Sequence, residues 1–203
     1  MDLTKNLDKL YELYTPDSNK FVLVEVPKLP FAVIEGKGNP EEENTSQGIK
    51  YLLKVITPIK KEAKKKMGKS FIAPPIEILY FADDMNDIVN GNKDKWKYKI
   101  MITLPFWIDD KLFQEGIDEA KKAFPSQDFS PYLDWIEEGL CVQIMHKGDI
   151  SNIPALLQDL YISFLHEENL LPHGAYHEIY LDNSVTFNKK NCKIILRQPV
   201  KEM

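Results

Sequence analysis

Apolar residues recur along this chain at two spacings, which predict helices in some segments and strands in others. Apolar residues three or four positions apart are typical of an amphipathic helix, whereas short β-branched runs are typical of strands. Pro58 interrupts one helical pattern, and Asp109 is a favourable N-cap for the next. The predicted helices cover residues 1–15, 49–66, 109–124 and 152–165. The predicted strands cover residues 21–26, 31–36, 76–81, 98–104, 140–145, 175–181 and 192–197.

The order of these elements occurs twice, as a strand, a helix and two further strands. The corresponding residues are Gly38 with Gly148, Glu77 with Glu178, and Pro105 with Pro199. The sequence therefore predicts one α+β domain over residues 1–203, built from duplicated βαββ units. Repeat one covers about 20–106, a linking helix about 109–124 and repeat two about 132–203. We expect an antiparallel sheet with outer helices and a central ligand cleft; coincidence is the alternative, because any two βαββ stretches look alike at this level.

Composition narrows the class of protein. The 203 residues include 26 Lys and Arg against 31 Asp and Glu, and this acidic balance argues against nucleic-acid binding. No apolar run is long enough to span a membrane, and the amino terminus has no apolar signal core, so we expect a cytoplasmic protein without membrane contact. Two cysteines are too few for a disulfide scaffold or a zinc cluster. No glycine-rich phosphate loop is present, so we expect no cofactor. His166 and His173 have no Asp or Glu at ligand spacing, so we expect no metal.

The candidate chemistry lies in the acidic residues that interrupt the middle strand of each repeat. Glu77 and Glu178 are the catalytic candidates, because two carboxyls in different environments can divide acid and base roles. A solvent-facing glutamate is the alternative for each of them. Tyr180 shares a strand face with Glu178, whereas His177 points to the other face and is expected to be structural. The predicted ligand-binding residues are Tyr180, Trp135, Trp107, Glu137, Tyr80 and Tyr132.

Two motifs resemble the GyrI-like small-molecule-binding domain family. They are Glu-Gly-Leu-Cys-Val-Gln at 138–143, and His-Glu-Ile-Tyr-Leu at 177–181. The segments at 30–38 and 195–200 are also similar to this family, so the resemblance covers the chain from about residue 20 to its end. The resemblance implies a duplicated fold of the SHS2 or bacterial effector-binding type, with a cleft lined by aromatic residues and one or two glutamates.

The resemblance also implies a planar, aromatic or cationic small molecule as the partner. Some stand-alone members of the family hydrolyse cyclopropanoid DNA-alkylating compounds, so turnover by water is the first functional hypothesis. A noncatalytic module that sequesters or senses its ligand is the second, and a protein that protects DNA gyrase is the third. The first-half motif has Tyr80-Phe81 where the family usually has two tryptophans, which changes the expected shape of the ligand site.

Overall fold

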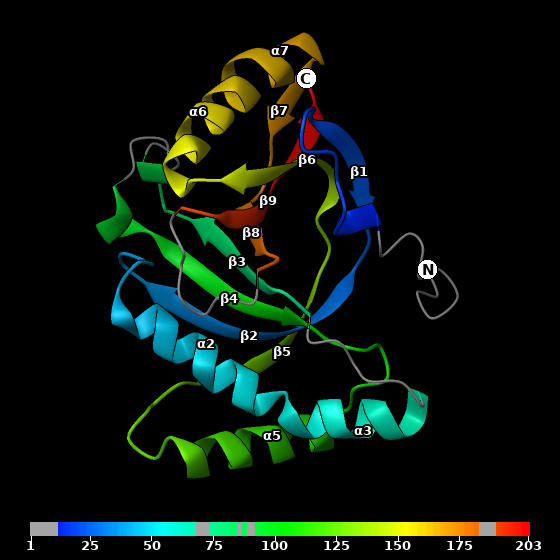
Figure 1. The fold of residues 1–203 in the computed structure, drawn as a ribbon, viewed down its shortest axis with the longest axis vertical. Helices are drawn as coiled ribbons and strands as arrows, with labels where there is room; N and C mark the ends of the chain where they lie inside the picture. The colour runs from blue at the N-terminus through cyan, green and yellow to red at the C-terminus, as the bar shows by residue number, and fades with distance from the viewer. Residues whose placement is uncertain (1–11, 68–73, 85–86, 89–91, 183–189) are drawn as a thin grey trace. The chain divides into compact units, whose positions relative to one another are not determined.

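The computed structural model describes residues 12–67, 74–84, 87–88, 92–182 and 190–203, and its mixed α+β architecture confirms the predicted fold class. The chain forms two compact units, each with its own antiparallel strands and helices (Figure 1). Unit 1 comprises Met1–Lys28 and Glu137–Met203, and unit 2 comprises Leu29–Ile136. Among the residues that the structure describes, no helix is long and apolar enough to cross a membrane.

Unit 2 is a four-stranded antiparallel arrangement in the order β3-β4-β2-β5. Its strands are β2 (Leu29–Lys37), β3 (Ile76–Phe81), β4 (Lys97–Thr103) and β5 (Tyr132–Ile136). Its helices are α2 (Glu43–Val55), α3 (Thr57–Met67), η1 (Lys93–Lys95) and α5 (Asp110–Ala123). The sequence predicts all of these strands except β5.

Helix α2 covers one face of the unit 2 strands. Gly48 of α2 lies against the side chain of Ile100 in β4, and the Thr45 hydroxyl donates to the Tyr98 hydroxyl at 2.9 Å. The long helix predicted over 49–66 is divided at Ile56, two residues before Pro58, which lacks a backbone N–H donor. Asp109 caps α5 as predicted, since its side chain accepts from the backbone N–H of Leu112.

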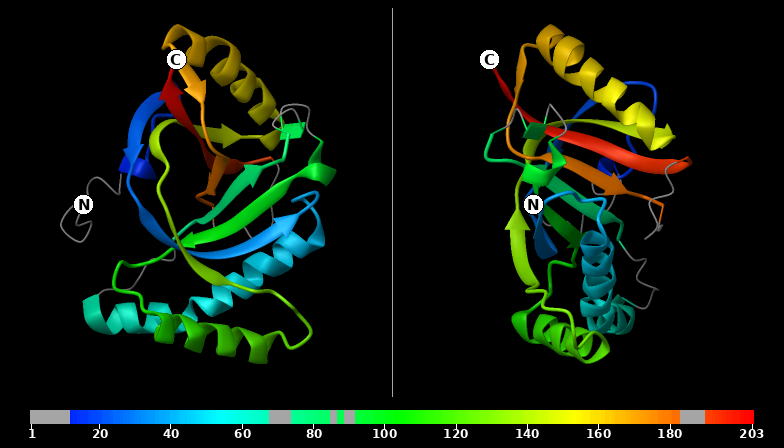
Figure 2. Two further views of the ribbon diagram at one scale, coloured as in Figure 1. Left: turned by 180° about the vertical axis from the view of Figure 1, so that it is seen from behind. Right: turned by 90° about the vertical axis from the view of Figure 1, so that its left-hand side faces the viewer.

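Unit 1 has the strand order β1-β6-β9-β8, and the short strand β7 also pairs with β9 (Figures 1 and 2). The strands are β1 (Val22–Val26), β6 (Gly139–Gly148), β7 (Leu170–Pro172), β8 (Tyr176–Tyr180) and β9 (Cys192–Glu202). A helical segment follows β6 as η2 (Ile150–Asn152), α6 (Ile153–Gln158), the π-helical turn η3 (Asp159–Phe164) and α7 (Leu165–Glu167). Leu160 and Leu165 of this segment pack in one buried cluster with Val142 of β6 and Val200 of β9.

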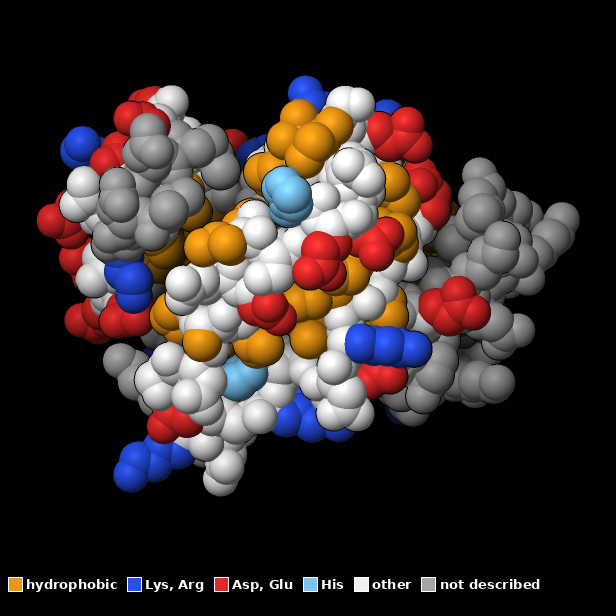
Figure 3. Space-filling model, turned by 90° about the horizontal axis from the view of Figure 1, so that it is seen from above, with side chains coloured by type: hydrophobic (Ala, Val, Ile, Leu, Met, Phe, Trp, Pro, Cys, Tyr) orange, Lys and Arg blue, Asp and Glu red, His pale blue; other side chains and the backbone are white. Residues whose placement is uncertain are grey.

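The helical segment of unit 1 begins at Ile150, two residues earlier than the sequence predicts. Asp149 caps this segment, because its side chain accepts a hydrogen bond from the backbone N–H of Ser151 at 2.9 Å. The outer face of the segment is exposed and mixes acidic with apolar side chains, including Ile162 at 66% exposure (Figure 3). The apolar side of the predicted amphipathic helix thus packs on the strands, and a few apolar side chains such as Ile162 lie on its exposed side.

The predicted leading helix falls mostly outside the described residues. Within the described part, Glu12 and Leu13 are helical, and the chain then runs along unit 1 toward β1. The backbone N–H of Met145 in β6 donates to the carbonyl of Asp17 at 2.9 Å. Leu13 is only 2% exposed, so this segment belongs to the packed part of unit 1.

Candidate functional site

The half-buried carboxylate of Glu178 in β8 accepts hydrogen bonds from two tyrosines. Tyr176 and Tyr180 lie two residues before and after Glu178, so the alternation of a strand puts the three side chains on one face. The Tyr176 hydroxyl donates to Oε1 of Glu178 at 3.0 Å, and the Tyr180 hydroxyl donates to Oε2. Each carboxylate oxygen therefore has its own phenolic donor.

This face of β8 is the one that carries the helical segment of unit 1. Glu178 is paired with Leu196 of β9, whose side chain shares a face with Gln198 two residues further on. The Gln198 side-chain oxygen accepts a hydrogen bond from the Tyr161 hydroxyl of η3 at 2.7 Å. Burial raises the pKa of Tyr161, so this phenol remains a donor at neutral pH.

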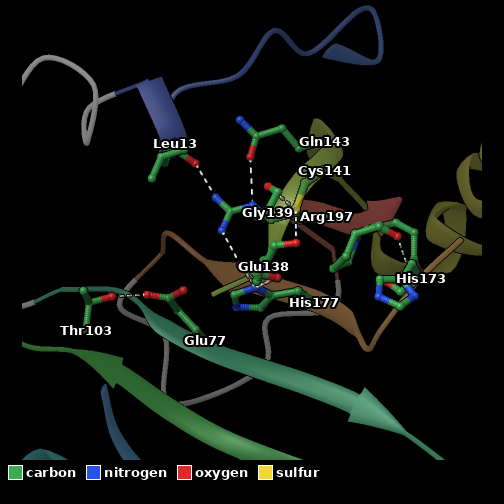
Figure 4. Close-up of polar contacts among 12 residues, drawn as sticks. Leu13, Glu77, Thr103, Glu138, Gly139, Cys141, Gln143, His173, His177 and Arg197 are labelled. Carbon is green, nitrogen blue, oxygen red and sulfur yellow. Dashed lines mark hydrogen bonds and ion pairs between the residues drawn. The ribbon is translucent and has the colours of Figure 1, made fainter. Parts of the chain in front are cut away.

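A buried ionic network occupies the opposite face of the same strands (Figure 4). Nδ1 of His177 lies 3.0 and 3.1 Å from the two carboxylate oxygens of Glu138. Nη1 of Arg197 donates to Oε2 of Glu138 at 3.0 Å, and its Nε donates to Oε1 of Gln143 at 3.0 Å. Nη2 of Arg197 donates to the carbonyl of Leu13 at 2.8 Å, which ties the N-terminal segment to the network.

The network holds Glu138 in its charged form. Burial by itself raises the pKa of Glu138, but the charges and hydrogen bonds of His177 and Arg197 outweigh burial and lower that pKa to about 2. His177 and Arg197 are 0% and 1% exposed, so the network is shielded from water and salt. The sequence analysis includes Glu138 only in the family motif at 138–143 and misses this role, since no local motif links residues this far apart.

Glu77 in unit 2 is fully buried and accepts a hydrogen bond from the Thr103 hydroxyl of β4 (Figure 4). It is paired with Met101, and the next residue, Ile78, is paired with Ile100, which faces α2. Glu77 therefore lies on the face of the unit 2 strands that points away from α2.

Tyr132 shares this face with Glu77 and belongs to a charged cluster. The Tyr132 hydroxyl donates to Oε1 of Glu35 at 2.6 Å, and Nζ of Lys99 lies 5.7 Å from the centre of the Tyr132 ring. Lys99 also donates to Asp134 at 3.0 Å. Burial lowers the pKa of Lys99, but Asp134 and Tyr132 outweigh burial and raise it.

The remaining predicted ligand-binding residues do not share one face. Tyr80 is buried on the α2 side of unit 2, where its ring lies 5.5 Å from that of Trp96. Trp135 is 45% exposed and lies 5.8 Å from Phe106, ring centre to ring centre. Trp107 is half-buried after β4, whereas Glu137 is exposed. The structure thus brings Tyr180 to Glu178, and puts Tyr132 on the face of Glu77.

The two glutamates at matching repeat positions point to different sides of their own strands. Glu178 faces the helical segment of unit 1, whereas Glu77 faces away from α2 of unit 2. In unit 1 the side chain that points away from the helices is that of His177. Corresponding positions in the two repeats thus do not give Glu77 and Glu178 equivalent surroundings, because an offset of one residue between two strands reverses the face of every side chain.

The chemistry available in the described residues is that of carboxylates and phenols. No group of three or more potential metal ligands occurs among them. Cys141 is buried, and burial together with the charge of Glu138 raises the pKa of its thiol, which disfavours a nucleophilic thiolate. A half-buried glutamate flanked by tyrosines instead suits a domain that holds an aromatic or cationic small molecule.

The described strands and helices form a mixed α+β domain. A family model described as the GyrI-like small molecule binding domain matches residues 19–199, and the chain belongs to this family. The match confirms the resemblance carried by the two sequence motifs. No curated protein matches the chain.

Solved structures with the same fold include two from Listeria innocua. One, described as an uncharacterized conserved protein, is 27% identical with a TM-score of 0.79, over 96% of this chain and 98% of its own. The other, described as a hydrolase, is 27% identical with a TM-score of 0.76, again over 96% of this chain and 98% of its own. The C-terminal domain of EcmrR shares the fold at 12% identity and a TM-score of 0.54, over 91% and 98% of the two chains.

Proposed function

We propose that this protein binds a flat, aromatic small molecule beside Glu178 and hydrolyses it, with a strained cyclopropanoid ring as the reacting group. The observation that carries the proposal is the Glu178 carboxylate, half-buried and hydrogen-bonded by both Tyr176 and Tyr180. The likeness to the Listeria innocua protein described as a hydrolase, which extends over nearly the whole of both chains, supports the same reaction class.

Glu178 is the general base in this proposal. Its carboxylate accepts a proton from a water molecule as the water oxygen forms a bond to the strained ring carbon. The carbon–carbon bond of the ring breaks, and its electron pair moves through the conjugated system to the substrate carbonyl oxygen, which then takes up a proton. The product is the substrate plus one water, so no oxidant or reductant is needed.

The phenols position the base and provide recognition. With a donor on each oxygen, the carboxylate is held in one orientation, so less reorganisation is needed during proton transfer. Aromatic faces beside a carboxylate also attract planar and cationic groups, at about 0.5–2 kcal/mol for each cation–π contact. Two further roles and the central cleft stay predictions. The first role is that of a second catalytic carboxyl, for Glu77. The second is contact with the ligand, for Trp135, Trp107, Glu137, Tyr80 and Tyr132.

The test is incubation with a cyclopropanoid DNA-alkylating compound, followed by mass analysis of the product. We expect the wild type to add one water, and Glu178→Gln to lose at least about 100-fold in rate while still binding the compound. Glu168→Gln is the matched control, because Glu168 is an exposed carboxyl of the same unit. Equal rates for the wild type and Glu178→Gln would contradict the role of Glu178.

Two other outcomes would replace the proposal. Saturable binding of the intact compound without turnover would favour the noncatalytic module that sequesters or senses its ligand. Copurification with DNA gyrase, in the absence of small-molecule binding, would favour the gyrase-protecting protein. Either result would contradict hydrolysis by this chain.

A further inference from the structure

The strand that carries Glu178 is anchored from its other face by His177. These two residues are neighbours in β8, and strand alternation sends their side chains to opposite sides of the same short segment of backbone. Each is paired across to β9, His177 with Arg197 and Glu178 with Leu196. Any movement of His177 therefore moves the backbone from which the Glu178 carboxylate projects.

The anchor is built from contacts at Nδ1 of His177 and around Arg197. Both oxygens of Glu138 lie within 3.1 Å of Nδ1 of His177, and Arg197 holds one of these oxygens at 3.0 Å. Arg197 is itself fixed by Gln143 of β6 and by the carbonyl of Leu13. The network thus ties β8 to β9, to β6, to the turn before β6 and to the N-terminal segment.

Stability alone does not explain why this interior is ionic rather than apolar. Replacing a buried ion pair with apolar residues of similar size is often neutral or stabilising, because the charges lose their hydration. Four polar side chains, those of Glu138, Gln143, His177 and Arg197, nevertheless occupy this interior. What a buried hydrogen-bonded network does supply is a defined geometry, since its donors and acceptors must meet their partners.

We propose that His177 and Glu138 are positioning residues for Glu178. The inference rests on the proposed function of Glu178 and extends it to the opposite face of β8. By holding His177 at Nδ1, Glu138 sets the position of β8 against β9, and this position sets the direction of the Glu178 carboxylate. A displacement of about 1 Å in a reacting group can lower a rate by about 100-fold.

Three variants test this inference. In His177→Ala the contact with Glu138 is lost, and we expect kcat to fall by about 10- to 100-fold while KM changes by less than about threefold. In His177→Asn a side-chain N–H is retained close to the position of Nδ1–H, so we expect most of the turnover to return. Leu165→Ala is the control, because it removes buried apolar contacts in unit 1 without touching the network.

Hydrogen exchange of the backbone supplies a readout that does not need the reaction. We expect the amides of residues 176–181 to exchange faster in His177→Ala, relative to those of β6, and to exchange at the wild-type ratio in Leu165→Ala. Unchanged exchange of β8 in His177→Ala would overturn the inference. So would wild-type kcat in that variant, or an equal fall of kcat in Leu165→Ala.

The two proposals fail in different ways. A wild-type protein without turnover contradicts hydrolysis, and the exchange measurement then decides the anchoring of β8 alone. A wild-type protein with turnover, together with a His177→Ala variant of equal kcat, contradicts the positioning role and leaves the role of Glu178 intact.

Discussion

Replacing Glu138 with glutamine removes the charge at the centre of the buried network. The pKa of Glu138 falls from an ordinary 4.5 to about 2 in the folded protein, against the effect of burial, because His177 and Arg197 stabilise its charge. At about 1.4 kcal/mol for each unit of pKa, this lowering of the pKa corresponds to about 3 kcal/mol of folding free energy at neutral pH. Leaving the Arg197 charge buried without its partner predicts a similar loss, about 3–5 kcal/mol.

The lowered pKa of Glu138 also predicts how this stability difference changes with pH. A depressed carboxyl pKa contributes stability that is complete above the pKa of the unfolded chain and is lost as the pH falls through the folded pKa. The free energy of unfolding of the wild type should therefore exceed that of Glu138→Gln by about 3 kcal/mol at pH 6, and this difference should narrow progressively down to pH 2. The other carboxyls titrate in both proteins, so their effects cancel in the difference.

Urea unfolding at a series of pH values measures this difference. Glu137→Gln is the matched control, since it makes the same chemical change at the exposed neighbouring residue. We expect it to lie within about 0.5 kcal/mol of the wild type. A difference between wild type and Glu138→Gln that is below about 1 kcal/mol, or that does not change with pH, would refute the electrostatic reasoning.

Two further predictions concern packing and reactivity. A methyl group at Gly116 of α5 would lie 1.9 Å from the carbonyl oxygen of Val55, so Gly116→Ala should lower the free energy of unfolding in urea by about 3 kcal/mol. Lys121→Ala, at an exposed position of the same helix, should change it little. Equal stability of the wild type and both variants would contradict the close approach of α2 and α5. Because Cys141 is buried and its thiol pKa is raised, iodoacetamide at pH 8 should label it only in urea. Peptide mass analysis separates Cys141 from the half-buried Cys192, and stoichiometric labelling of Cys141 in the native protein would contradict this prediction.

Local sequence determined most of the elements. Apolar periodicity, Asp109 as an N-cap and the break beside Pro58 are interactions within a few residues, so the order of helices and strands could be predicted from them. The two motifs at 138–143 and 177–181 also indicated the GyrI-like family, and the family model confirms this membership. The side chains of Tyr180 and Glu178 meet because alternation is a property of the strand itself.

Tertiary structure decided the register and the long-range contacts. Glu77 and Glu178 occupy corresponding positions in the two repeats, yet Glu178 faces the helices of its unit and Glu77 faces away from α2. Pairing with β4 and with β9 sets the face of each residue, and a shift of one position would send the side chain to the other face. The contact of Glu138 with His177 joins residues 39 positions apart, and Arg197 reaches Leu13 across 184 positions. Such contacts depend on how the strands come together, and no local spacing in the chain encodes them.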